Sequence, residues 1–282
     1  MLGYQALVKL KNELNIDFAY SESLTALPDA SRAAREYAIA GYDLVIGHSG
    51  SYTGILIEIS KDFPKTTFVV QADLKPENIP KNVGAFFYNA HEPYYLIGYL
   101  AGKMTKTNKI GVIGGSKIPY MIEWVNALEL AAKKANPNVT VTKTFLGSFN
   151  DPVLAKETAL TQIGTGADVI SFQQNEGAKG IIEAVKEKTV YAFGHHYDMN
   201  AFAPTLILTS MISNVEQIFR MVITSAKAGT FAGKMNYYSI RDGATDIAPF
   251  YGLISKSLEA EVMQLRQDII QNKLTVPRIA TL

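Results

Sequence analysis

Hydrophobic positions along the chain follow two alternating patterns: short continuous apolar runs, and longer stretches with apolar residues three and four positions apart. The short runs are typical of strands buried in a parallel sheet, and the longer stretches of amphipathic helices. The predicted strands are residues 16–19, 42–46, 68–70, 85–88, 110–113, 139–145, 168–172, 190–193, 206–208 and 235–240. The predicted helices are 2–14, 29–40, 55–61, 93–104, 152–164, 177–186, 214–228 and 258–271, with another that begins at Pro119. This alternation predicts an α/β fold with helices on both faces of parallel sheets.

A polar stretch divides the alternation into two series. The helix predicted over 93–104 is followed by Thr105, Lys106, Thr107 and Asn108, and the apolar strand 110–113 comes next. A polar connector between a helix and a new strand is typical of a joint between two lobes. We therefore expect two lobes with a hinge at residues 105–109.

The first lobe begins unusually. A doubly wound sheet normally starts with a strand, whereas this chain starts with the helix predicted over 2–14. Either a first strand and its loop are missing from this sequence, which we favour, or the lobe is built unusually.

Candidate binding residues follow the predicted strands, because ligands of open α/β sheets bind beyond the carboxyl ends of the strands. The strand over 139–145 is followed by Phe149, Asn150 and Asp151, which offer an aromatic face, an amide and a carboxylate. Such a set suits a planar heterocycle, although Asp151 before Pro152 is equally well explained as a helix N-cap.

Other strand ends carry similar side chains, each of which also has a purely structural explanation. The amides Gln174 and Asn175 follow the strand 168–172, and His196 and Asp198 follow the strand 190–193. Further candidates are the opposite charges Arg241 and Asp242, the carboxylate Asp73, and Ser49 after the strand 42–46. An exposed turn explains Arg241 and Asp242 as well as a binding role does.

Composition and charge exclude several classes of function. Of the 282 residues, 48% are hydrophobic and 19% charged, the formal net charge is +1, and no basic block is present, which argues against nucleic acid as the main partner. No apolar run approaches the roughly 18 residues of a membrane span. Cysteine is absent, which excludes disulfides and thiol nucleophiles. The amino terminus shows no charged-then-apolar leader.

Motifs for metal, phosphate or catalytic chemistry are incomplete. His195 and His196 are adjacent on an extended segment, so their side chains point in opposite directions, which disfavours a shared metal. His91-Glu92 resembles the start of H-E-x-x-H, but position 95 is Tyr95. The glycines Gly114 and Gly115 follow a strand without completing a phosphate loop, so close packing explains them better. No nucleophile elbow is present. The residues predict a binding protein with no cofactor or metal rather than an enzyme.

Several segments resemble the basic membrane protein family, the substrate-binding lipoproteins of ABC importers related to the purine nucleoside receptor. The similar segments, in the family's order along nearly the whole chain, are residues 41–48, 91–106, 113–119, 147–152, 166–170, 190–194 and 242–250.

The resemblance implies a type I periplasmic binding protein fold, with two Rossmann-like lobes, a ligand cleft between them and three crossings near 105–109, 209–212 and 229–236. The expected amino-terminal lobe is 1–106 with 211–234, and the carboxyl-terminal lobe is 107–210 with 235–282. It further implies a monomeric, extracytoplasmic protein, lipid-anchored in its precursor, that delivers a purine nucleoside or nucleobase to a membrane permease.

This sequence also departs from the family pattern. It starts just after the family's first strand and its base-contacting loop, and it has Gly50 where relatives often carry an aromatic, so Tyr52 is the candidate for that stacking role. His196 replaces one of the family's aspartates, which changes the hydrogen bonds that a ligand can make. A riboflavin-like ring is therefore an alternative ligand. A cytoplasmic sensor of the same fold and, with less support, a nucleotide-dependent enzyme are the alternative functions.

Overall fold

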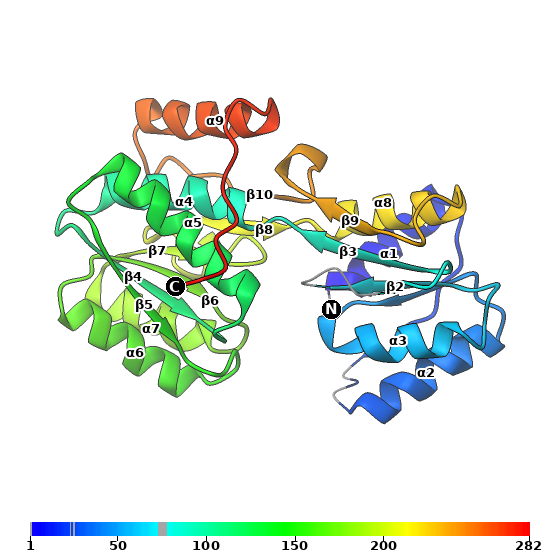
Figure 1. The fold of residues 1–282 in the computed structure, drawn as a ribbon. Helices are drawn as coiled ribbons and strands as arrows, with labels where there is room; N and C mark the ends of the chain where they lie inside the picture. The colour runs from blue at the N-terminus through cyan, green and yellow to red at the C-terminus, as the bar shows by residue number, and fades with distance from the viewer. Residues whose placement is uncertain (1, 23, 25, 73–77) are drawn as a thin grey trace. The chain divides into compact units, whose positions relative to one another are not determined.

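The computed structural model describes residues 2–22, 24, 26–72 and 78–282. The chain forms two compact units (Figure 1). Unit 1 comprises Met1–Tyr88 and Asn214–Tyr238, and unit 2 comprises Asn89–Ser213 and Ser239–Leu282.

Unit 1 is built on a four-stranded sheet in the order β1-β2-β3-β9, with every neighbouring pair parallel. Figure 1 shows α2 and α3 on one face of this sheet and α1 and α8 on the other. Its strands are β1 (Leu44–Gly47), β2 (Thr67–Gln71), β3 (Val83–Tyr88) and β9 (Met235–Tyr238), and its helices are α1 (Leu2–Glu13), α2 (Leu27–Ile39), α3 (Thr53–Ser60) and α8 (Val215–Lys227), with the short 3-10 helix η1 (Gly50–Tyr52). Phe68 and Val70 lie at the centre of the core beneath α2 and α3.

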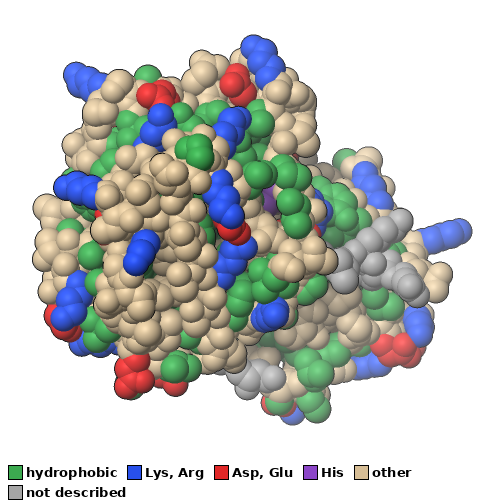
Figure 2. All heavy atoms as spheres, turned by 60° about the vertical axis from the view of Figure 1, so that its left-hand side comes forward, with side chains coloured by type: hydrophobic (Ala, Val, Ile, Leu, Met, Phe, Trp, Pro, Cys, Tyr) green, Lys and Arg blue, Asp and Glu red, His purple; other side chains and the backbone are tan. Residues whose placement is uncertain are grey.

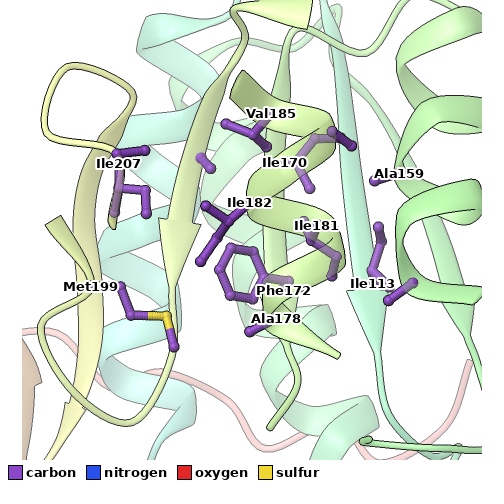
Figure 3. Close-up of a cluster of buried hydrophobic side chains, with 14 of the residues drawn as sticks. Ile113, Ala159, Ile170, Phe172, Ala178, Ile181, Ile182, Val185, Met199 and Ile207 are labelled. Carbon is purple, nitrogen blue, oxygen red and sulfur yellow. The ribbon is translucent and has the colours of Figure 1, made fainter. Parts of the chain in front are cut away.

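Unit 2 is built on a six-stranded sheet in the order β10-β8-β7-β6-β4-β5, which is parallel except for β10. Its strands are β4 (Lys109–Gly114), β5 (Thr140–Phe145), β6 (Val169–Gln173), β7 (Tyr191–Gly194), β8 (Ile207–Ser213) and β10 (Thr245–Ile247). Its helices are α4 (His91–Met104), α5 (Pro119–Ala135), α6 (Pro152–Gly164), α7 (Ala178–Lys188) and α9 (Lys256–Ile270), with η2 (Asn200–Phe202) and η3 (Ile240–Asp242). Phe172 of β6 packs against Ile182 of α7 and Met199 in the core on the α6–α7 face (Figure 3).

Helices α4 and α5 approach each other backbone to backbone. A Cβ atom added to Gly98 would lie 2.1 Å from the carbonyl oxygen of Leu128, and one added to Gly102 would lie 2.5 Å from that of Ala132. Since real Cβ atoms do not come so close, both positions require glycine. The small residues between the apolar positions of α4 therefore set the distance between two helices that cover the same face of the sheet.

The division into units differs from the expected lobes at each crossing. The chain passes between the units at 88/89, 213/214 and 238/239, so α4 belongs to unit 2. The strand over 235–238 belongs to unit 1, because β9 pairs with β3.

Residues 105–109, expected to be the hinge, lie inside unit 2, where one carboxylate holds them. The Thr105 hydroxyl donates to Asp168 at 2.6 Å, and the backbone amides of Lys106 and Thr107 donate to the same side chain at 2.6 and 3.0 Å. A polar connector with all of these groups satisfied is a fixed turn rather than a joint.

Local sequence signals correctly located most elements. Asn214 caps α8 by accepting a hydrogen bond from the Gln217 amide, and Asp151 caps α6 by accepting from the Val153 and Leu154 amides. The predicted strand at 16–19 is wrong: within the described part of the chain these residues pair with no strand. The strand predicted to end at 240 ends at Tyr238, and Ile240 begins η3.

Candidate functional site

The loops at the carboxyl ends of β4, β5 and β6 meet around Phe149. The Phe149 ring lies across the end of β4, where a Cβ atom on Gly115 would be 2.1 Å from the ring. The Phe149 carbonyl accepts hydrogen bonds from the amides of Asn175 at 2.9 Å and Gly177 at 3.1 Å. The glycine after β4 thus allows the loops of β5 and β6 to join over the strand between them. The structure brings the segment of Phe149, Asn150 and Asp151 together with that of Gln174 and Asn175.

Two adjacent glutamines at the end of β6 are buried without partners. Gln173 is 1% exposed and Gln174 is 2% exposed. The Oε1 and Nε2 atoms of both side chains lack a hydrogen bond to any described residue. Each unpaired buried polar group costs about 1–3 kcal/mol, so we expect these amides to find their partners in a bound water or a ligand.

Asp151 and Asp198 both make local hydrogen bonds. Oδ1 of Asp151 is the N-cap acceptor of α6, which is the structural explanation given above. Oδ1 of Asp198 accepts from the Asn200 amide at 3.0 Å, and Oδ2 accepts from the Tyr251 hydroxyl. These bonds fix the orientation of both carboxylates and leave fewer lone pairs for a ligand.

The loop after β7 is anchored by a buried aromatic cluster. Nδ1 of His195 lies 2.7 Å from the Tyr94 hydroxyl, and the His195 ring lies 5.5 Å from the Trp124 ring. Burial and the neighbouring His196 hold the pKa of His195 well below 6.5, so this imidazole is neutral at physiological pH. His196 has φ of 69° and its Nδ1 lies 3.2 Å from the Ser213 hydroxyl. The turn that carries His196 is therefore rigidly held.

Arg241 and Asp242 each bind another residue in the structure. Arg241 donates to Glu92 of α4 at 3.0 Å, while Asp242 accepts from the amide and hydroxyl of Ser239 in a capping box. Glu92 is only 3% exposed, and burial raises its pKa despite the arginine. The expected opposite-charge turn is thus a buried pair between α4 and η3, with Arg241 half-exposed.

The remaining candidates lie in unit 1 or outside the described residues. Ser49 caps η1 by accepting from the Ser51 amide, and the Tyr52 hydroxyl donates to the Leu24 carbonyl at 2.8 Å. Asp73 falls outside the described residues. Ser49 and Tyr52 follow β1 as expected, at the carboxyl end of the unit 1 sheet.

The family profile described as ABC transporter substrate-binding protein PnrA-like matches residues 2–280. The chain belongs to this family. Relatives of this PnrA-like protein include basic membrane proteins, which confirms the resemblance seen in the sequence. The family consists of solute-binding proteins rather than enzymes, and its members serve membrane permeases.

Three relatives carry informative names. The transcriptional activator protein med of Bacillus subtilis is 24% identical over 93% of this chain and 81% of its own length. A purine-binding protein of Brucella abortus is 27% identical over 83% of this chain and 66% of its own. The nucleoside-binding protein BmpA of an ABC transporter in Lactococcus lactis is 27% identical over 84% and 72%, respectively.

Solved structures with this fold include both transport and regulatory proteins. A solute-binding protein from Conexibacter woesei has a TM-score of 0.81 at 22% identity, covering 98% of this PnrA-like chain and 93% of its own. A transcriptional activator of the comK gene from Bacillus halodurans has a TM-score of 0.87 at 21% identity, covering 97% and 94%. These likenesses confirm the predicted type I periplasmic binding protein fold.

Several properties of the described residues bear on function. No group of three His, Cys, Asp or Glu side chains is placed to hold a metal ion within them. Their helices include none long and apolar enough to cross a membrane. Figure 2 shows basic, acidic and hydrophobic side chains side by side on the face it presents, in line with the formal net charge of +1.

Two features of the candidate site could not be predicted from the sequence. Gln173 directly precedes the candidate Gln174 in the sequence, yet only the structure shows that both side chains are buried and have no partner among the described residues. Glu92 stood out in the sequence only as part of an incomplete H-E-x-x-H motif, and nothing in the sequence links it to Arg241, 149 positions away. Both features depend on the tertiary structure, because only the folded chain determines which polar side chains find a hydrogen-bond partner.

Acid should destabilise unit 2 through His91. Burial and the nearby Arg278 lower the pKa of His91 from 6.5 to about 4. Between pH 6.5 and about 4 the His91 imidazole is protonated in the unfolded chain but not in the folded one. The free energy of unfolding therefore falls as the pH is lowered through this range. From pH 7 to 5 the expected contribution of His91 to this loss is about 2 kcal/mol, and His195, whose pKa is also lowered, adds to it.

Urea unfolding followed by fluorescence of Trp124, the only tryptophan, measures this loss in unit 2. His91→Gln should flatten the pH dependence by that amount, whereas His48→Gln in unit 1 should leave the Trp124 transition unchanged. An unaltered slope in His91→Gln would contradict the assignment.

Proposed function

We propose that this protein binds a purine nucleoside or nucleobase as the extracytoplasmic, monomeric component of an ABC importer, with a lipid anchor in its precursor. The observation that carries the proposal is the buried, unpaired amide pair Gln173 and Gln174, because Oε1 of Gln174 and the carbonyl of Phe149 both lie next to Gly177. An aromatic face binds the plane of a heterocycle, and amide groups offer a donor and an acceptor to its edge. The names of the Brucella and Lactococcus relatives support the same ligand class.

Calorimetry with adenosine, guanosine, inosine and adenine tests the ligand. We expect at least one of them to bind with a dissociation constant in the micromolar range or below. Riboflavin belongs in the same series, since the aromatic and amide chemistry also suits its ring. Absence of heat from all four purines would overturn the purine proposal, and heat from riboflavin alone would replace it.

Gln174→Leu should weaken binding while it stabilises the free protein. The leucine removes two buried polar atoms that have no partner within the described residues, so unfolding of the free protein should cost about 1–3 kcal/mol more. The same change removes a hydrogen-bonding group from the ligand, and affinity should fall about 10- to 100-fold.

The matched control is Gln264→Leu on the exposed surface of α9, which should change neither quantity appreciably. Calorimetry measures the affinity, and urea unfolding of the ligand-free protein measures the stability. A Gln174→Leu protein with both lower stability and unchanged affinity would show that the amide has a structural role.

A second candidate function, a ligand sensor of the same fold, rests on the two transcriptional activators among the similar proteins. The two functions predict different partners for the same ligand complex. Co-purification of the ligand-bound protein with a membrane permease supports transport, and co-purification with a DNA-binding partner supports sensing.

A further inference from the structure

Helices α4 and α5 of unit 2 both begin without a side-chain cap. Their N-cap residues are Ala90 and Ile118, and neither side chain accepts a hydrogen bond from its helix. By contrast, α6, α8 and α9 are capped by the side chains of Asp151, Asn214 and Ser255. The first amides of a helix have no partner within the helix, so an uncapped start frays unless another part of the protein holds it.

Residues 276–281, which follow α9, bind to the starts of both helices, and we call this segment the strap. Figure 1 shows the final segment (red) running from α9 past α4 and α5. Val276 is buried, and its backbone is hydrogen-bonded to the imidazole of His91, the first residue of α4. Arg278 donates two hydrogen bonds to the carboxylate of Glu123 in the second turn of α5, from Nε at 2.9 Å and from Nη2 at 3.3 Å. The strap therefore holds the first turns of two uncapped helices.

A second residue of α5, Asn126, binds the backbone of the strap. Its Nδ2 donates to the carbonyls of Ile279 and Thr281, both at 2.8 Å. A side-chain amide has two N–H groups, so both are used by the strap. Oδ1 of Asn126 accepts from the Lys143 ammonium of β5 at 2.8 Å, which fixes the orientation of the amide. These bonds hold the strap along α5 beyond its ion pair.

The part of α5 that the strap holds is connected to the candidate site in two ways. Residues 116–118 alone separate Gly115 from the start of α5, and the Phe149 ring lies against Gly115. The ring of Trp124, in the second turn of α5, is centred 5.5 Å from that of His195 in the loop after β7. A movement of the α5 start therefore displaces the backbone on which the Phe149 ring rests and loosens the packing of the β7 loop.

We propose that the strap positions the start of α5 and, through it, the loop that carries Phe149. Arg278 and Glu123 are its positioning pair, and they act through α5 rather than by contact with the ligand. Glu123 is only 6% exposed, so the pair is partly buried and its loss is not compensated by water. The expected effect on ligand affinity rests on the proposed function of the Phe149 site, whereas the effect on the loop itself is measurable without a ligand.

Arg278→Ala in the full chain tests the strap by amide hydrogen exchange. We expect the amides of residues 122–126 to exchange about tenfold faster, because the start of α5 opens more often when the strap is released. The amides of Asn175 and Gly177, which donate to the Phe149 carbonyl, should exchange about threefold faster or more. Calorimetry with the best purine ligand should show an affinity about tenfold lower.

A double variant separates release of the strap from the burial of an uncompensated charge. Arg278→Ala leaves the Glu123 carboxylate buried without its arginine, which is destabilising by itself. Adding Glu123→Gln removes that charge but does not restore the strap. We expect the double variant to regain part of the lost urea midpoint, yet to keep the fast exchange at residues 122–126 and at Gly177. Recovery of slow exchange in the double variant would overturn the proposal.

Two controls make the result specific. Lys273→Ala removes a positive charge from the exposed stretch between α9 and the strap and should change neither exchange nor affinity. Helix α6, which Asp151 caps, should keep its exchange rates in every variant. Unchanged exchange at residues 122–126 in Arg278→Ala would overturn the proposal whatever the ligand is, and so would faster exchange there with Gly177 unaffected. Absence of purine binding by the original protein would contradict only the proposed function, since the exchange rates decide the role of the strap.

Discussion

Gly98→Val is expected to unfold unit 2. The added Cβ atom would lie 2.1 Å from the Leu128 carbonyl oxygen and 2.7 Å from the Leu128 Cα, and these backbone atoms cannot rotate away. Helices α4 and α5 would have to separate and expose the apolar surface that they bury. We expect a loss of more than about 4 kcal/mol, at the upper end of single substitutions. Urea unfolding followed through Trp124, on α5 itself, measures it.

Gly164→Ala is the matched control for this substitution. It lies in α6 of the same unit, and a Cβ atom there meets nothing within 4 Å. We expect stability to stay equal or to rise by up to about 1 kcal/mol, because alanine favours a helix over glycine. A Gly98→Val protein that unfolds at the midpoint of the original would show that α4 and α5 are further apart than described.

Gly115→Val is expected to abolish most ligand binding while unit 2 stays folded. The new side chain occupies the place of the Phe149 ring, which has room to swing away because its loop is half-exposed. The stability loss should therefore stay near 1–2 kcal/mol. Displacing the ring removes a stacking surface and disturbs the bonds from Asn175 and Gly177 to the Phe149 carbonyl. Together these changes should lower affinity about 100-fold.

Phe149→Ala and Phe149→Tyr separate the ring from the loop geometry. Both variants keep Gly115, so they differ only in the side chain at position 149. Phe149→Ala removes the ring and should reproduce most of the affinity loss of Gly115→Val. Phe149→Tyr keeps an aromatic ring and should retain binding within about tenfold. Calorimetry with the best purine ligand measures all three. Full affinity in Gly115→Val would show that the ligand lies elsewhere.

Local sequence signals were sufficient for most of the fold, because helices and buried strands have distinct periods and caps. They were insufficient where a residue far away in the sequence determines the local structure. Residues 105–109 look like a linker, since the sequence cannot show that Asp168, some 60 positions away, satisfies their polar groups. Similarly, β9 joins unit 1 through pairing with β3, which no local pattern reveals.

The candidate site was predictable in part, for a similar reason. Residues that follow strands were correctly expected to share one edge of a sheet, which brings Phe149, Gln174 and Asn175 together. Whether a polar side chain is free for a ligand depends on its neighbours after folding. Arg241 is engaged by Glu92, and Asp198 is engaged by Tyr251. The sequence therefore predicts which residues follow the strands, but it does not predict which of their side chains are free to bind a ligand.

The glycine contact between α4 and α5 also limits how unit 2 can move. Where side chains separate two packed helices, changes of their rotamers allow one helix to slide along the other in a shear motion. At Gly98 and Gly102 the backbones of the two helices are in direct contact. No side chain can adjust there, so the axial register of α4 against α5 is fixed. A conformational change within unit 2 must therefore leave α4 and α5 moving together as one rigid block.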